Sequence, residues 1–325
     1  MAKIAVIGSG AVGCYYGALL ARAGHDVRFL MRRDLKTVRA RGLEIRSPGG
    51  DFRLEHAQAF ASSGEIGPVE WVICSLKSTV LEEAPRLITP CVGPGTRIVA
   101  LMNGLGLEDQ LAEAFGARRV FGAMAFVCIN RGEPGIVHHL KYGRVTAGHL
   151  LDEPGEAGQL CELLASAGID VALAPALRAA RWEKLCWNVP FNGLSVAGGG
   201  LGTELIVRDT HLRAVAARAM REVVAIANAD LAAAGKEERL DEESVVRSMF
   251  ALTDTMGDYR TSMALDYVAG RPLEVEAIHG NVVRRARDLG LDATTVATLY
   301  ALVRVADLRR RGLVAAIAGA EGAAM

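Results

Sequence analysis

The sequence predicts an α/β chain in which a doubly wound, mostly parallel sheet domain over residues 1–175 precedes an all-α domain over residues 176–325. Residues 1–33 read as strand, glycine turn, helix and strand, and strand and helix signals alternate through the rest of the first half. From about residue 176 strand signals vanish and helical periodicity takes over. A length of 325 residues with 51% hydrophobic residues suits two domains with separate cores.

A glycine turn follows the first predicted strand. Gly8, Gly10 and Gly13 have the spacing G-x-G-x-x-G, after the apolar run 4–7 and before an Ala/Leu-rich helical segment. In a dinucleotide site, the first glycine permits the tight turn, the second lets the backbone approach a pyrophosphate, and the third lets the helix pack on the strand. The helix start adds N–H groups and a positive dipole end. The alternative is an ordinary turn with incidental glycines.

The end of the second predicted strand, 27–31, distinguishes between the two nicotinamide dinucleotides. In an NAD site, a carboxylate about 20 residues past the glycines binds the ribose 2′-hydroxyl. Arg32 and Arg33 occupy that region here, and guanidinium groups suit a 2′-phosphate. The sequence therefore predicts NADPH, with Arg32 as the main contact and Arg33 as the second. Asp34 keeps NAD open as an alternative, and both arginines could instead be solvated charges.

Composition and charge argue against several classes of function. Lys plus Arg and Asp plus Glu number 37 each, so we expect a small-molecule partner and neither nucleic acid nor a membrane surface. The six cysteines lack a C-x-x-C pair and the histidines lack carboxylates at ligand spacing, so we expect reduced thiols and no metal. Without a run of about 18 apolar residues for a membrane span, we expect a cytoplasmic protein.

The remaining elements follow from the same patterns. A hairpin is predicted around residues 48–50, between strands 43–46 and 51–55. Further strands are predicted over 71–75, 97–102 and 120–124, and shorter ones over 126–130, 136–140, 144–147 and 169–173. Apolar residues at spacings of three and four predict helices over 212–234, 243–256, 273–289 and 294–310. We expect the Ala/Gly-rich segment 315–325 to fray.

Three groups of polar residues are candidates for a site. Ligands of doubly wound sheets bind beyond the carboxyl ends of strands, where Lys77 and Asn103 lie; the alternatives are a solvated lysine and an Asn-Gly turn. At 3.6 residues per turn, Lys184, Asn188 and Asn192 share one stripe of a helix, and the Trp and Phe residues around them favour a polar cleft over an exposed face. The third group lies within 261–276.

In that third group, Gly270 and Pro272 predict a helix stop and a new helix with Pro in its first turn. Glu274 would lie in the same first turn, where the helix dipole also allows it a purely structural role. In the second group, Pro190 should kink the helix by removing a hydrogen bond to residue 186.

Together these motifs resemble the ketopantoate reductase (2-dehydropantoate 2-reductase) family, over nearly the whole chain. The resemblance rests on GSGAVG, Asn103-Gly104, Lys184 with Asn188 and Asn192, and Ser262-Met263 followed by Glu274. It implies a Rossmann domain joined to a helical domain, with NADPH reducing a 2-oxo acid in the cleft between them. The expected reaction is conversion of 2-dehydropantoate to pantoate in pantothenate biosynthesis.

The resemblance also implies a role for each candidate. Lys184 would be the general acid that protonates the carbonyl oxygen as hydride arrives, and Glu274 would orient substrate and lysine. The ligand contacts would be Asn188, Asn192 and Ser262 for the substrate, and Gly8, Gly10, Gly13, Arg32, Lys77 and Asn103 for the cofactor. The lysine role is chemically sound, because hydride addition places negative charge on oxygen and a cation stabilises that charge.

The chain departs from the family pattern at several positions, which cast doubt on ketopantoate itself more than on the cofactor. These positions are Met102, Pro190, 198–200, Gly202, Tyr259 and Glu276. One alternative is therefore a reductase of another branched or aromatic 2-oxo acid, a D-2-hydroxy acid dehydrogenase. The other is a non-catalytic NADP-sensing protein, against which Lys184 and Glu274 argue. The sequence is compatible with a homodimer but does not determine the oligomeric state.

Overall fold

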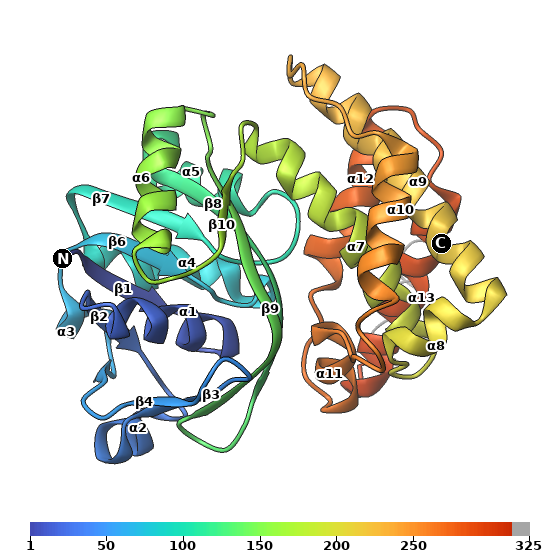
Figure 1. Cartoon of the computed structure of the whole chain (residues 1–325). Coiled ribbons are helices and arrows are strands. Elements are labelled where there is room, and N and C mark those ends of the chain that lie inside the picture. The colour runs from blue at the N-terminus through green and yellow to red at the C-terminus, as the bar shows by residue number, and fades with distance from the viewer. Residues whose placement is uncertain (314–325) are drawn as a thin grey trace. The chain divides into compact units, whose positions relative to one another are not determined.

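The structure is a computed structural model that describes residues 1–313 (Figure 1). The chain divides into two compact units, one from Met1 to Leu177 and a second that begins at Arg178. The boundary expected from the sequence, after residue 175, lies close to this division. The segment 315–325, for which we expected fraying, lies outside the described residues.

The first unit is built on a ten-stranded sheet with the order β4-β3-β9-β8-β7-β6-β1-β2-β5, and β10 pairs with β9. Strands β8, β7, β6, β1, β2 and β5 pair in parallel, whereas β9 runs antiparallel to β8 and β4 antiparallel to β3. The strands are β1 Lys3–Ile7, β2 Asp26–Leu30, β3 Leu43–Arg46, β4 Phe52–Leu54, β5 Gln58–Phe60, β6 Val69–Cys74, β7 Val92–Ala100, β8 Val120–Arg131, β9 Ile136–His149 and β10 Val171–Leu173. The prediction of a mostly parallel α/β sheet is confirmed.

Helices cover this sheet, and their apolar faces form the core of the first unit with β1, β2 and β6. Helix α1 packs so closely that a Cβ on its Gly17 would lie 2.6 Å from the ring of Phe29 in β2. The helices of this unit are α1 Ala11–Arg22, α2 Leu35–Arg41, α3 Ser63–Ile66, α4 Ala84–Ile88, α5 Leu107–Phe115 and α6 Pro154–Ala165, with 3-10 turns η1 Ser78–Glu83, η2 Thr89–Cys91 and η3 Ala117–Arg119.

Two strand predictions need correction. The segments 120–124 and 126–130 form one strand, β8, and 136–140 and 144–147 form one strand, β9. The antiparallel ladder between β8 and β9 shifts register near Val127 and Ile129, and Tyr142 has a φ of 65°. These irregularities interrupt the alternation of apolar and polar residues, so the sequence pattern of each long strand predicted two short strands. The short strand β5 was not predicted at all.

The described part of the second unit consists of helices joined by loops, without a strand. Its elements are α7 Leu177–Ala197, α8 Thr203–Arg208, α9 Thr210–Ala233, α10 Glu242–Thr253, α11 Ser262–Val268, the π-helix η4 Glu276–Gly280, α12 Asn281–Asp288 and α13 Thr294–Arg310. Helix α7 continues through Pro190. Within residues 1–313, no helix combines the length and hydrophobicity that crossing a membrane requires.

A buried aspartate joins three helices of the second unit. Asp230 in α9 is 0% exposed and accepts hydrogen bonds from Arg178 at 2.5 Å and from Trp182 Nε1 at 2.7 Å, both in α7. It also pairs with Arg285 of α12. Burial opposes ionisation, yet these donors hold the pKa of the Asp230 carboxyl below its ordinary value. The network fixes the first turns of α7, the helix that carries Lys184.

Candidate active site

The turn after β1 has a shape that only glycine allows at two positions. Gly8 has a φ of +102°, and a Cβ there would lie 2.5 Å from the backbone nitrogen of Leu76. A Cβ on Gly13 would lie 2.2 Å from Ser75 Oγ. A Cβ on Gly10, by contrast, would have no neighbour closer than 4.0 Å. Protein packing thus demands the first and third glycines, whereas the space beside Gly10 is open to a ligand.

The remaining cofactor candidates of the first unit lie at the same edge of the sheet as this turn. Strands β1, β6 and β7 are parallel neighbours, so their carboxyl ends meet at one edge. Lys77, which is exposed, follows β6, and Asn103, which is half-buried, follows β7. No side chain caps α1, whose N-terminal N–H groups face the turn. This edge of the sheet therefore presents backbone donors and a lysine side chain.

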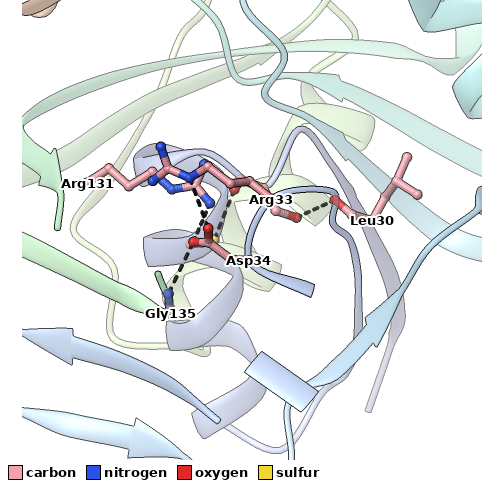
Figure 2. Close-up of polar contacts among 7 residues, drawn as sticks. Leu30, Arg33, Asp34, Arg131 and Gly135 are labelled. Atoms are coloured by element: carbon pink, nitrogen blue, oxygen red, sulfur yellow. Dashed lines mark hydrogen bonds and ion pairs between the residues drawn. The ribbon is translucent and has the colours of Figure 1, made fainter. Parts of the chain in front are cut away.

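At the end of β2, the Asp34 carboxylate and the Arg32 guanidinium have different surroundings, and Figure 2 shows those of Asp34. The Asp34 carboxylate is buried and accepts hydrogen bonds from Arg131, from Arg33 Nε at 3.2 Å and from the Gly135 backbone nitrogen at 3.2 Å. Burial opposes its ionisation, yet these donors lower the pKa of Asp34. Arg32 is exposed, and its guanidinium has no hydrogen bond or ion pair within residues 1–313.

In the second unit, Lys184, Asn188 and Asn192 form one face of α7, here called the α7 face. Both asparagines are buried, at 3% and 2% exposure. Lys184 is half-buried, with its Nζ 5.5 Å from the centre of the Trp187 ring. Asn192 Oδ1 is buried and has no hydrogen-bond partner among the described residues. A buried acceptor without a hydrogen-bond partner is unfavourable for folding.

The third group supplies two further polar residues. Ser262, half-buried, is the first residue of α11, whose N-terminus is capped by Thr261 Oγ1 accepting from the Ala264 nitrogen at 3.2 Å. Glu274 is 5% exposed. A single π-helical turn, η4, follows it closely, and such turns recur at functional sites.

The predicted start of the helix around Glu274 was wrong. Helical structure begins at Val275, after Glu274, and Pro272 does not lie in a first turn. The backbone nitrogen of Leu273 donates to Asp307 Oδ1 at 3.0 Å, a long-range contact of this segment that no local sequence pattern reports.

His279 was not among the residues predicted from the sequence. Its side chain is fully buried in η4, and its Nε2–H donates to the Val189 carbonyl of α7 at 2.9 Å. Burial lowers its pKa to about 4, so the ring is neutral near pH 7. The bond links the turn after Glu274 to helix α7, one residue past Asn188. A lone histidine within a helical pattern carries no signal for such a contact.

Several departures from the family pattern have local explanations. A Cβ on Gly202 would lie 1.7 Å from Asp258 Oδ1, so glycine is required here while Asp258 keeps its position. Glu276 accepts hydrogen bonds from Tyr300 at 2.9 Å and Arg284 at 2.7 Å on the surface of the second unit. No group of His, Cys, Asp and Glu that could hold a metal ion exists in the part of the chain that the structure describes.

Two family models, described as ketopantoate reductase PanE/ApbA and its C-terminal part, match residues 4–152 and 176–307. The chain belongs to the ketopantoate reductase family. A 2-dehydropantoate 2-reductase of Nostoc sp. is 36% identical over 315 residues, which are 95% of this chain and 96% of that protein. A crystal structure of 2-dehydropantoate 2-reductase from Geobacter metallireducens has a TM-score of 0.90 and 41% identity, covering 94% of this chain and 99% of that one.

A more distant likeness concerns the fold alone. D-mandelate dehydrogenase with NADH and anilino(oxo)acetate has a TM-score of 0.85 at 20% identity, covering 95% of this chain and 99% of that one. The predicted family, the predicted Rossmann-type fold with a helical second part, and the predicted oxidoreductase class are confirmed. The chain is an NAD(P)-dependent oxidoreductase of a family that acts on a small 2-oxo acid.

Proposed function

We propose that this chain reduces 2-dehydropantoate to pantoate with NADPH. One observation carries the choice of NADPH. At the end of β2 the Arg32 guanidinium has no partner within the described residues, while the next acid in the sequence, Asp34, accepts hydrogen bonds from Arg131, Arg33 and Gly135. A 2′-phosphate would form an ion pair with the Arg32 guanidinium. A 2′-hydroxyl would find the acceptor that it needs already occupied.

The cofactor-binding residues lie in the first unit. Gly8, Gly10 and Gly13 with the start of α1 would hold the pyrophosphate, and Lys77 and Asn103 would hold the nicotinamide end. When bound, the reduced cofactor supplies a hydride to the carbonyl carbon of the substrate.

The catalytic residues lie in the second unit. Lys184 holds a proton on Nζ and transfers it to the carbonyl oxygen, whose growing negative charge the ammonium also stabilises. The buried carboxylate of Glu274 orients the lysine and the substrate. The amides of Asn188 and Asn192 and the hydroxyl of Ser262 bind the substrate's polar groups. Asn192 Oδ1, which lacks a partner among residues 1–313, can accept from the hydroxyl of 2-dehydropantoate.

Two experiments test this proposal. Purified protein is assayed with NADPH against 2-dehydropantoate and a panel of branched and aromatic 2-oxo acids, and we expect the highest kcat/KM with 2-dehydropantoate. A preference for an aromatic acid would favour the D-2-hydroxy acid dehydrogenase alternative. Arg32→Ala should weaken NADPH binding far more than NADH binding, and equal weakening would contradict the proposed role. A homodimer and a cytoplasmic location stay predictions.

A further inference from the structure

Asp34 occupies the N-cap position of α2 but does not cap the helix. An aspartate at this position usually accepts from the N–H groups of the first helical turn. No side-chain cap bond forms here; only the backbone carbonyl of Asp34 continues into the helix, accepting from the Val38 nitrogen at 2.8 Å. The carboxylate faces a distant part of the chain instead. Something other than local helix chemistry therefore determines where this charge lies.

That distant part is the turn between β8 and β9. Arg131, the last residue of β8, pairs with Asp34 Oδ2, which also accepts from the Gly135 nitrogen. Gly135 has a φ of +83°, and its carbonyl accepts from the Glu44 nitrogen at 2.9 Å, which attaches the turn to β3. Figure 2 shows the carboxylate enclosed by Arg131, Arg33 and Gly135. The turn between β8 and β9 thus holds the Asp34 carboxylate through one ion pair and one backbone hydrogen bond.

We propose that Arg131 is a positioning residue for cofactor specificity: it neutralises and restrains Asp34, so that the adjacent Arg32 presents an uncompensated positive charge to a 2′-phosphate. The inference rests on the proposed use of NADPH. Asp34 is the only acid in the segment 31–34, which joins β2 to α2. An unrestrained carboxylate there would repel a 2′-phosphate and would accept from a 2′-hydroxyl.

The residues that surround the carboxylate explain why Arg131 matters more than Arg33. Arg131 is 29% exposed and bonds to the carboxylate over a separation of 97 residues, so its removal deletes a partly buried ion pair. Arg33 is 64% exposed and lies beside Asp34 in the sequence, where solvent screens its pairing. Without Arg131, the carboxylate regains freedom within its own segment.

The experiment measures binding of adenosine 2′,5′-bisphosphate and of 5′-AMP to the full chain by calorimetry, which needs no turnover. Arg131→Leu should weaken the bisphosphate at least tenfold and 5′-AMP less than about threefold. Adding Asp34→Asn to Arg131→Leu should restore bisphosphate binding to within about threefold of the parent, because the freed carboxylate is gone. Asp34→Asn alone should leave bisphosphate binding unchanged or tighter. Arg97→Leu is the matched control, since Arg97 is also 29% exposed and pairs with Glu156 in the same unit.

The outcomes separate two failures. If the parent protein binds both nucleotides equally well, the proposed NADPH preference is wrong and this inference falls with it. If the parent prefers the bisphosphate and Arg131→Leu retains that preference, Arg131 has no such role. A double variant as weak as Arg131→Leu would mean that Arg131 acts on the phosphate directly and not through Asp34. Should Arg131→Leu fail to fold, a tenfold weakening in the Asp34→Asn variant would overturn the inference.

Discussion

The glycine turn of the first unit and the α7 face of the second are prepared for a ligand in opposite ways. The turn excludes side chains: at Gly8 and Gly13 the neighbouring backbone and Ser75 leave no room for a Cβ, and the protein's own atoms hold the shape. The α7 face instead collects polar side chains in a buried setting and leaves Asn192 Oδ1 without a partner among the described residues. The packing of the glycine turn is satisfied by protein atoms alone, whereas the α7 face leaves one buried hydrogen-bond acceptor unsatisfied among the described residues.

This difference separates stability from function. Where packing sets the shape, a substitution that harms binding also harms folding. Where a buried polar group lacks a partner, its removal harms function while folding is unaffected or improved, because the unmet hydrogen bond is unfavourable in the free protein.

The largest effect is expected at Lys184. Lys184→Ala should lower kcat by about 100-fold or more, the usual contribution of a general acid. NADPH affinity should stay nearly unchanged, because the cofactor-binding residues belong to the first unit. Steady-state kinetics and fluorescence titration with NADPH measure the two quantities. Lys236→Ala, which removes another half-buried lysine of the same unit, is the control and should retain activity. Full activity of Lys184→Ala would end the proposed role.

Gly13→Ala should destabilise the first unit. The new Cβ would lie 2.2 Å from Ser75 Oγ and 2.5 Å from the Gly8 carbonyl oxygen, so the turn itself must shift. We expect the free energy of unfolding to fall by roughly 1–3 kcal/mol, with weaker cofactor binding. Gly10→Ala is the matched variant: it should change stability by less than about 0.5 kcal/mol and still weaken cofactor binding. Equal loss of stability in the two variants, measured by chemical denaturation, would contradict the contrast.

The same contrast explains how much could be predicted from the sequence. The glycine turn was predictable because its function depends on local backbone sterics, which three glycines at fixed spacing report. The 294–310 helix was predicted with the bounds that the structure gives to α13, whose buried residues Val296, Leu299 and Val303 lie at spacings of three and four. Strands β8 and β9 were divided wrongly because the register shifts in their mutual ladder interrupt the alternation of apolar and polar residues along each strand.

The second unit shows what local sequence cannot report. The stripe of Lys184, Asn188 and Asn192 follows from helical geometry and was predictable. The contact from Leu273 to Asp307 beside Glu274 and the bond from His279 to α7 join residues far apart in the chain. Such contacts depend on tertiary packing, so neither composition nor periodicity carries them.

A smaller effect, with the opposite sign on stability, is expected at Asn192. Asn192→Leu replaces a buried amide whose oxygen lacks a partner within residues 1–313 by an apolar side chain of similar size. The midpoint of thermal unfolding should stay the same or rise, while KM for the 2-oxo acid rises roughly 10-fold to 100-fold through loss of substrate hydrogen bonds. Asn228→Leu is the control, because both ends of that amide bond to Leu240. It should lower the midpoint and leave KM unchanged. A destabilised Asn192→Leu would refute the idea that this oxygen is reserved for a ligand.

The smallest effect concerns how the free energy of unfolding depends on pH in acid, through Asp230 of the second unit. Because the pKa of Asp230 is lower in the folded protein than its ordinary value of 3.8, the stability that this carboxylate provides is present above that value and is lost as pH falls through the folded pKa. In Asp230→Asn, the slope of unfolding free energy against pH should therefore be shallower below about pH 4, by at most about 1.4 kcal/mol per pH unit, the value for one proton. Urea unfolding between about pH 5 and about pH 2 measures the slope. If the variant and the parent lose stability in parallel, Arg178, Trp182 and Arg285 do not hold this carboxylate in its charged form, and the α7 face depends on packing alone for its position.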